Sequence, residues 1–500
     1  MRRIALATAL CLLAAGAHAQ SQLRIGIGDD PDALDPSLSR TYTARIVFAS
    51  ICDKLFDIDD KLNIIPQLGL SHEISADGKA LTIKLRPGVK FHDGEAFDAT
   101  AAKYSLDRHL TMRGSFRKPE LALVDTVEVV DPLTVRLNLK QPFSPLLAQL
   151  TDRAGMMVSP KAAEAAGDKF ALKPVCAGPY RFVERVQQDR IVVEKFADYW
   201  NKDQVFIDRI TYLPIVDATV RLANLRSGSL DMMERVLATD IKTVRDNPKL
   251  RLSKAVSIGW FGLLVNVANG PASDNPLGKD PRVRRAFDLA IDREAINQVV
   301  YNGEFVAGNQ WVNPQHPYYQ QKFPVPKRDL GKARALLKEA GVSGRIPIDF
   351  MVGNTPEVRA VAEVVQSMVA EIGFDLKIRV TEVATALKEA EDGKFQLYQN
   401  TWSGRIDTDG NSIIYQTCGA PQNMGKYCDK EIDALHAQAR ATSDPAQRKA
   451  IYEKLTEKFL ASGWILYLYH PQYLIAHTER LEGFVPIQDG ILRVVGVKLK

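Results

Sequence analysis

The stretch 66–97 constrains the fold more than any other part of this chain, because it combines a strand pattern with three tight-turn sequences. Leu81, Ile83 and Leu85 alternate with polar residues, which is the period of a half-buried strand. The turn sequences around this strand are Asp77-Gly78, Pro87-Gly88 and Asp93-Gly94. Two further strand-like runs, 124–130 and 133–139, follow a predicted helix at 100–109. The sequence therefore predicts an antiparallel, hairpin-rich region in the first third of the chain.

The second half of the chain has a different pattern. Strand-like runs at 346–352 and 376–380 flank a helical pattern at 356–372, which is the order of a βαβ unit with a largely parallel sheet. Asp280 followed by Pro281 is typical of a helix start. A chain of 500 residues is too long for one hydrophobic core, so we expect two or three domains of α/β class.

The N-terminus has the pattern of a secretory signal peptide. Arg2 and Arg3 precede an apolar run at 4–16, which is too short to span a bilayer, and Ala17-His18-Ala19 fits a cleavage site. We expect cleavage after Ala19 and an exported, soluble periplasmic protein. A formal net charge of +5, spread along the chain, gives no case for nucleic-acid binding.

Four cysteines remain after removal of the signal peptide, and an even number in an oxidising compartment suggests disulfides. Cys418 and Cys428 form the better pair, because the residues between them can turn. A bond between Cys52 and Cys176 requires distant segments to meet, and the sequence leaves it open.

No catalytic or metal-binding pattern is present. The sequence lacks a Gly-x-Ser-x-Gly elbow, a His-Glu-x-x-His motif and a Cys-x-x-Cys motif, and no histidine lies at ligand spacing from another ligand. We therefore expect no enzymatic activity, no cofactor and no dedicated metal site. The alternative from another class is a secreted hydrolase, which would present a nucleophile and a base in one cleft.

Several long motifs together resemble one known family. They are the run 77–94, Ala177-Gly178-Pro179-Tyr180, the run 280–286 followed by Ala290-Ile291-Asp292-Arg293, the loop after Trp402, and Tyr427-Cys428-Asp429. In these motifs the chain resembles the periplasmic solute-binding proteins of peptide-type ABC transporters, the dipeptide, oligopeptide and nickel group known as family 5. The resemblance covers essentially all of the mature chain.

The resemblance implies a two-lobed, type II-like periplasmic-binding-protein fold with an extra subdomain inserted in the first lobe. The expected divisions are lobe I at 20–45, 175–265 and 478–500, the subdomain at 46–174, and lobe II at 266–477. It also implies a monomer that closes by a hinge on a peptide or peptide-like solute and delivers it to an inner-membrane ABC transporter permease. A chelated metal or another non-peptide anionic solute is the alternative cargo.

The segment 394–428 is the candidate recognition loop, because it places Trp402, Arg405 and Asp407 after a short strand. Peptide-binding members of the family place an aspartate where Arg405 stands here, and an arginine fits a carboxylate or phosphate. Three alternatives remain open: Arg405 pairs internally with Asp407 or Asp409, Asp407 takes over the ammonium-binding role, or the segment is only a solvated surface loop. The architecture also offers Tyr42, Trp260 and Asn266 as candidate ligand contacts.

Overall fold

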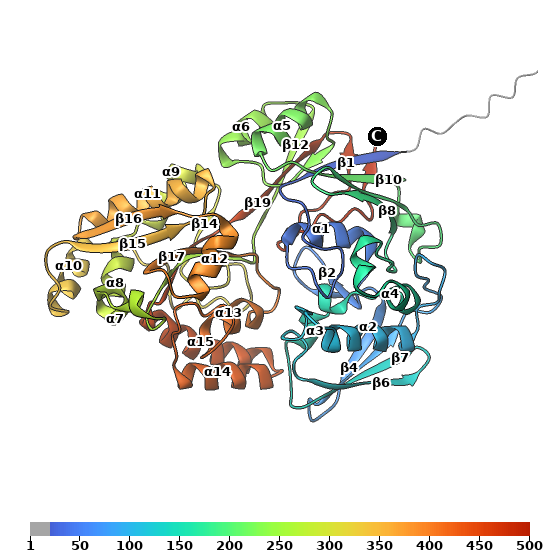
Figure 1. Ribbon diagram of the computed structural model, residues 1–500, viewed down its shortest axis with the longest axis horizontal. Helices are drawn as coiled ribbons and strands as arrows, with labels where there is room; N and C mark the ends of the chain where they lie inside the picture. Colours follow the sequence, from blue (N-terminus) through green and yellow to red (C-terminus); the bar gives the residue numbers. More distant parts are fainter. Residues whose placement is uncertain (1–20) are drawn as a thin grey trace, which may run out of the picture.

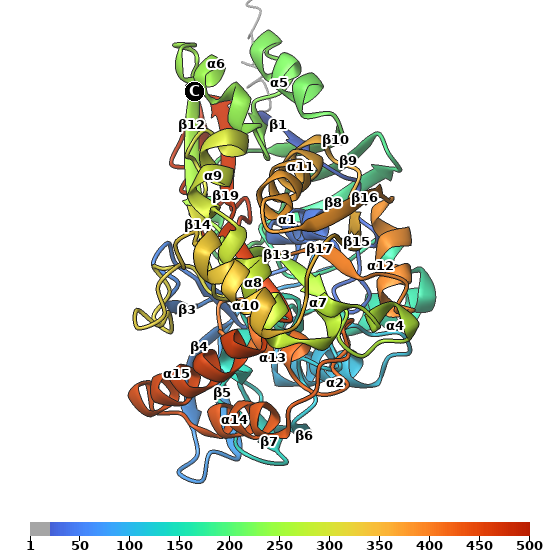
Figure 2. The same ribbon diagram turned by 90° about the vertical axis from the view of Figure 1, so that its left-hand side faces the viewer.

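The computed structural model describes residues 21–500 and divides them between two large β-sheets. The expected signal peptide, its cleavage site and Gln20 lie outside the described residues. Figure 1 shows the two sheets in separate halves of the molecule, which we call lobe I and lobe II. In the view turned by 90°, lobe II faces the viewer (Figure 2). No helix among residues 21–500 is long and apolar enough to cross a membrane.

Lobe I is built on a seven-stranded sheet. Its strands, in spatial order, are β12 (Leu250–Val256), β19 (Gln472–Thr478), β11 (Met232–Met233), β1 (Gln22–Ile27), β10 (Arg209–Pro214), β9 (Arg190–Lys195) and β8 (Tyr180–Val186). Its helices are α1 (Tyr42–Ile51), α5 (Ala218–Ser227) and α6 (Ile241–Arg245). Strand β1 runs parallel to both of its neighbours, β10 and β11, and its apolar side chains are fully buried.

The predicted hairpin-rich region forms a subdomain attached to lobe I. Its four-stranded sheet has the order β4 (Gly69–Ile74), β5 (Ala80–Leu85), β7 (Thr134–Leu139) and β6 (Val124–Asp131), and β2 (Phe56–Ile58) pairs with β3 (Ile64–Pro66) beside it. The subdomain helices are α2 (Ala99–Thr111), α3 (Leu146–Gln149) and α4 (Pro160–Ala166). Leu81, Ile83 and Leu85 all face a separate hydrophobic core, as their alternation predicts.

Lobe II contains a six-stranded sheet covered by helices. The strand order is β14 (Val306–Ala307), β18 (Ile465–His470), β13 (Trp260–Val265), β17 (Leu397–Trp402), β15 (Ile346–Val352) and β16 (Phe374–Val380). The helices are α7 (Pro276–Lys279), α8 (Pro281–Ala290), α9 (Arg293–Tyr301), α10 (Leu330–Glu339), α11 (Pro356–Ala370), α12 (Val383–Glu391), α13 (Asp409–Gln416), α14 (Lys430–Ala441) and α15 (Pro445–Ser462). The expected βαβ unit is present, because β15 and β16 are parallel and α11 connects them. Asp280 caps α8 as the sequence predicts.

The chain crosses between the lobes twice. It enters lobe II between β12 and β13 and returns between β18 and β19. Strand β13 pairs with β17 and β18, whereas β19 pairs with β12 and β11. The crossings therefore lie at 257–259 and at 471, each a strand earlier than the expected boundaries at 265 and 477. The strands at these boundaries, β13 and β19, are both largely apolar, so their sequences do not show to which lobe each belongs.

The C-terminal segment returns to lobe I. Leu492, Val494 and Val497 are buried in the core of lobe I, and β20 (Leu481–Glu482) pairs with β21 (Lys498–Leu499). The disulfide Cys52–Cys176, which the sequence left open, joins the end of α1 to the segment before β8. It therefore fastens the two chain segments at which the subdomain leaves and rejoins lobe I.

Candidate functional site

The loop between β17 and α13 is pressed against the first crossing between the lobes. Trp402, the last residue of β17, lies opposite Trp260 of β13. A Cβ atom at Gly259 would lie 1.9 Å from the Trp402 carbonyl oxygen, and one at Gly404, whose φ is +84°, would lie 2.5 Å from the backbone of Ile258. Both positions require glycine, so the recognition loop is held in one place by close backbone contact.

Asn411 fixes the shape of this loop from its first helical turn. Its Oδ1 accepts hydrogen bonds from Trp402 Nε1 at 3.0 Å and from the backbone N–H of Arg405 at 2.6 Å. Its Nδ2 donates to the Arg405 carbonyl at 2.8 Å. Asn411 is fully buried, so these bonds have no competition from solvent. No sequence pattern predicts this role, because Asn411 is an ordinary polar residue in a polar run.

Asp407 and Asp409 form ion pairs with arginines of the two helices that follow, α14 and α15. Asp407 forms a two-pronged ion pair with Arg448 at 2.6 and 2.7 Å, and Asp409 forms one with Arg440 at 2.7 and 2.8 Å. The hypothesis that Arg405 pairs with Asp407 or Asp409 is therefore wrong, because both carboxylates are engaged by arginines of α14 and α15.

Arg405 instead points across to lobe I. Its guanidinium lies 4.7 Å from the centre of the Trp402 ring, and its Nη1 donates to the Gly404 carbonyl at 2.7 Å. Its Nε lies 3.8 Å from Oδ2 of Asp152, which follows α3 in the subdomain of lobe I. The side chain is 16% exposed. A stacked, largely buried guanidinium is thus presented at the contact between the lobes.

Three more arginines surround Asp152, and together with Arg405 they form what we call the arginine cluster. Arg45 of α1 places Nε 3.1 Å from Asp152 Oδ2. Arg153 and Arg117 donate to the same carbonyl, that of Ser39, at 2.9 and 3.3 Å. Arg117 also pairs with Glu120 at 2.6 Å. Arg45, Arg117 and Arg153 are each at most 6% exposed.

The arginine cluster has more positive than negative charge. Its four guanidinium groups face the carboxylates of Asp152 and Glu120, and three buried guanidinium nitrogens donate no hydrogen bond: Arg45 Nη1, Arg117 Nε and Arg153 Nε. Burial, followed by the charge of Arg117, lowers the pKa of Arg153 to about 9. Although burial alone would raise the pKa of Asp152, the arginines hold it well below its usual range. Buried donors and uncompensated positive charge are what an anion would satisfy.

The lobes also touch at their outer rim. In the loop before α3, the Ser144 N–H donates to the Arg440 carbonyl at 2.9 Å, and the guanidinium of Arg440 lies 5.1 Å from the centre of the Phe143 ring. Figure 1 shows α3 and α14 facing each other at this point. Arg440 therefore links Asp409, the first residue of α13, to the opposite lobe.

Comparison with known proteins identifies the kind of molecule that carries this site. The family described as bacterial extracellular solute-binding proteins, family 5 (middle), matches residues 63–424. This chain belongs to that family. It is therefore a solute-binding protein and not an enzyme, and the hydrolase alternative is excluded.

Relatives of this family 5 protein match it over almost their whole length. The glutathione-binding protein GsiB of Pectobacterium atrosepticum is 31% identical over 97% of this chain and 96% of its own. The binding protein AgaA of A. tumefaciens, solved with agropinic acid, is 26% identical with a TM-score of 0.82, covering 96% of this chain and 99% of its own. DppA of Helicobacter pylori, solved with the peptide STSA, has a TM-score of 0.84 at 24% identity, covering 96% of this chain and 98% of its own. The two-lobed fold predicted from the motifs is confirmed.

The other candidate residues of this family 5 protein lie in different surroundings. Tyr42 stacks on Tyr473 at 5.7 Å, and Tyr473 donates to the Ser403 carbonyl at 3.3 Å, so Tyr42 is connected to the recognition loop. Trp260 is fully buried and its Nε1 has no hydrogen-bond partner. Asn266 uses both ends of its amide within lobe II, including a 2.9 Å bond to the Phe395 carbonyl, which is the arrangement of a structural brace.

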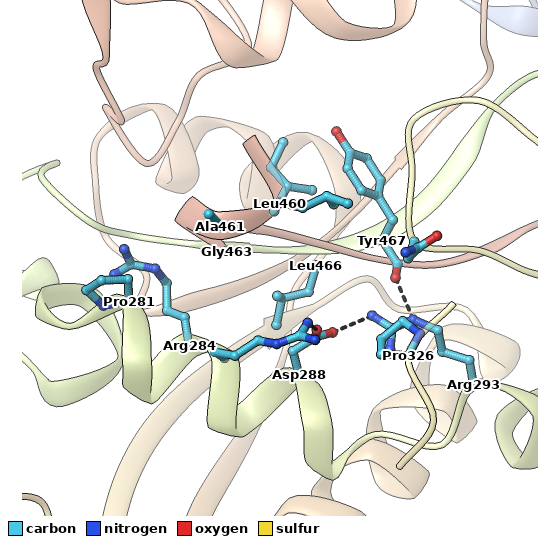
Figure 3. A pocket seen from close by; sticks show the side chains of 13 residues that line it. Pro281, Arg284, Asp288, Arg293, Pro326, Leu460, Ala461, Gly463, Leu466 and Tyr467 are labelled. Carbon is cyan, nitrogen blue, oxygen red and sulfur yellow. Dashed lines mark hydrogen bonds and ion pairs between the residues drawn. The ribbon is translucent and has the colours of Figure 1, made fainter. Parts of the chain in front are cut away.

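A small pocket in lobe II of this family 5 protein is crossed by an ion pair. It measures about 40 Å³ and lies between α8, the end of α15 and β18 (Figure 3). Arg293 crosses it to pair with Asp288 at 2.5 Å and donates to the Tyr467 carbonyl at 2.8 Å. A cavity of this size has room for about one water molecule. Among the described residues, no group of three His, Cys, Asp or Glu residues could hold a metal ion.

The predicted disulfide Cys418–Cys428 is present and closes the far end of the recognition segment, between α13 and α14. Replacing both cysteines by serine should lower the free energy of unfolding by about 3 kcal/mol, the chain-entropy value for so short a loop. The double replacement should also weaken solute binding, because α13, which ends beside Cys418, carries Asn411 and Asp409. Denaturant unfolding and calorimetry of the double variant measure the two effects. Unchanged affinity in a destabilised variant would show that the bond does not support the loop.

Proposed function

We propose that this protein captures a small peptide or peptide-like solute that carries carboxylate groups, and that it holds this solute at the contact between the lobes. The observation that supports the proposal is the arginine cluster, with its excess positive charge and its three unused buried donors. Arginine recognises a carboxylate through two parallel hydrogen bonds. The relatives named as glutathione-binding proteins make glutathione, with its two carboxylates, the first solute to test.

Within this proposal the candidate contacts have distinct roles. Arg405 binds an anionic group from lobe II, and Trp402 supports the guanidinium by stacking beneath it. Tyr42 lies beside the recognition loop through its stacking on Tyr473, whereas Trp260 supports the loop from the buried core of lobe II and Asn266 braces lobe II. Asp407 supports the loop through Arg448 and takes part in ammonium recognition only if that pair opens.

The remaining parts of the proposal concern export and delivery. The protein belongs to a family of periplasmic binding proteins that deliver solutes to ABC transporters. We place signal-peptide cleavage after Ala19, delivery at an inner-membrane permease of that class, and a monomer as the working form. We divide the chain into lobe I, its subdomain and lobe II between the sheets described above.

The test of cargo begins with protein purified from the periplasm without refolding and examined by native mass spectrometry. Calorimetry then compares glutathione with a derivative in which both carboxylates are amides. We expect glutathione to bind, and the diamide to bind at least about tenfold more weakly, because a charged hydrogen bond contributes roughly 1.5–3 kcal/mol. A retained cargo without any anionic group would contradict the proposal. Metal analysis of the same sample decides whether the anionic cargo is a chelator carrying a metal.

A further inference from the structure

Asp152 occupies a central position in the arginine cluster. It precedes a short 3-10 helix, and its Oδ1 accepts the backbone N–H of Arg153 at 2.8 Å. The same carboxylate lies within ion-pair distance of Arg45 and Arg153 on its own side and of Arg405 on the other lobe, at 3.1, 3.7 and 3.8 Å. Within residues 21–500, it is the one carboxylate that lies within 4 Å of a basic nitrogen of Arg405.

The contact between Asp152 and Arg405 is loose. At 3.8 Å the two groups attract each other but make no hydrogen bond. By comparison, Asp407 and Asp409 hold their arginines with two short bonds each. The Oδ2 atom of Asp152 is buried and accepts no hydrogen bond in the structure. The charge of Arg405 is therefore partly balanced by Asp152, but the two groups share no hydrogen bond. Its guanidinium can turn to a better acceptor without breaking a hydrogen bond to Asp152.

We propose that Asp152 is an internal competitor for the anionic group of the cargo, so that its negative charge limits both the affinity and the number of negative charges that the site accepts. The inference rests on the proposed function, since it concerns how the same arginines receive the solute. The four arginines outnumber the carboxylates of Asp152 and Glu120 by two, which leaves two positive charges without a partner. A cargo that brings two carboxylates neutralises them, and further negative charge is repelled by Asp152 at close range.

Removing the charge of Asp152 while keeping its shape tests the proposal. Asparagine and serine both cap a helix start as aspartate does, so Asp152→Asn and Asp152→Ser preserve the bond to the Arg153 N–H. Glu164→Gln, on the exposed face of α4, changes the net charge equally and is the matched control. The first probe is glutathione, measured by calorimetry. The second is citrate, a trianion with no resemblance to a peptide, measured by the rise in melting temperature.

We expect Asp152→Asn and Asp152→Ser to bind glutathione at least about tenfold more tightly than the parent, because a like charge near the bound carboxylate has been removed. Citrate should stabilise both variants more than it stabilises the parent or Glu164→Gln. If no variant binds glutathione while the citrate effect appears, glutathione as the cargo is wrong and the role of Asp152 stands. Equal or weaker citrate stabilisation in both Asp152 variants would overturn the inference, whatever the result with glutathione.

Discussion

Replacing Arg405 by alanine is expected to weaken binding of a carboxylate-bearing solute by at least about tenfold. Truncating one partner of a buried charged pair costs roughly 2–5 kcal/mol, and each 1.4 kcal/mol is a factor of ten in affinity. The guanidinium is stacked on Trp402 and largely buried, so neither water nor another side chain replaces it readily. Arg405→Lys should restore only part of the affinity, because an ammonium group cannot form two parallel bonds to a carboxylate.

Calorimetry with glutathione, or with the solute found by native mass spectrometry, measures this loss. Arg282→Ala is the matched control, because it removes an arginine that is half exposed on α8 and paired with Asp280. Its affinity should equal that of the parent. An Arg405→Ala protein that binds as tightly as the parent would show that Arg405 serves only the contact with Asp152.

Acidification is expected to destabilise the folded protein strongly. Burial lowers the pKa of His109 and His436 to about 3 and that of His92 and His470 to about 4. In the unfolded chain these groups have a pKa of about 6.5. Between about pH 6.5 and pH 4 these histidines are therefore protonated in the unfolded state but neutral in the folded state. The free energy of unfolding falls as the pH falls.

The size of the acid effect follows from these shifts. At pH 5 each of the four histidines costs about 2 kcal/mol, or about 8 kcal/mol together. Asp53 acts in the opposite direction, because burial raises its pKa to about 7 and its folded form gains a proton on acidification. This offsets about 3 kcal/mol. Burial also lowers the pKa of His316 and His477, which adds to the loss. We therefore expect a net loss of at least about 5 kcal/mol between pH 7 and pH 5.

Urea unfolding at pH 7, 6 and 5 measures this loss. In His436→Gln the side-chain amide can still reach Gln416, which His436 Nε2 contacts at 3.1 Å, but it cannot take up a proton. The pH dependence of this variant should be shallower by about 1.2 kcal/mol per pH unit between pH 6 and pH 5. His72→Gln, at an exposed position, is the control. Identical pH dependence in His436→Gln and the parent would contradict the prediction.

The sequence predicted the elements that depend on local patterns. The alternation at Leu81, Ile83 and Leu85, the cap at Asp280 and the βαβ unit of β15, α11 and β16 all appear where the patterns place them. The predicted boundaries between the lobes each lie one strand too late in the sequence, because β13 and β19 are apolar strands that would fit the sheet of either lobe. Only their pairing partners, which lie far away in the sequence, decide to which sheet they belong.

The candidate site was only partly predictable for the same reason. Trp402 and Arg405 stood out because they follow a strand in a glycine-containing loop. Arg45, Arg117 and Arg153 gave no signal, since each is an ordinary charged residue in its own segment. Their burial around Asp152 results from the folding of three separate regions onto one another, and no spacing in the sequence records it.

The position of β19 has a consequence for the order in which the two lobes can fold. This strand comes from the last thirty residues, yet it lies between β12 and β11 in the sheet that contains the first strand, β1. All the strands of lobe II, from β13 to β18, lie within one uninterrupted stretch of chain that is synthesised before β19. The half that begins the protein is therefore the half that is completed last, and a chain cut short before Gln472 would leave lobe I with an open gap in its sheet.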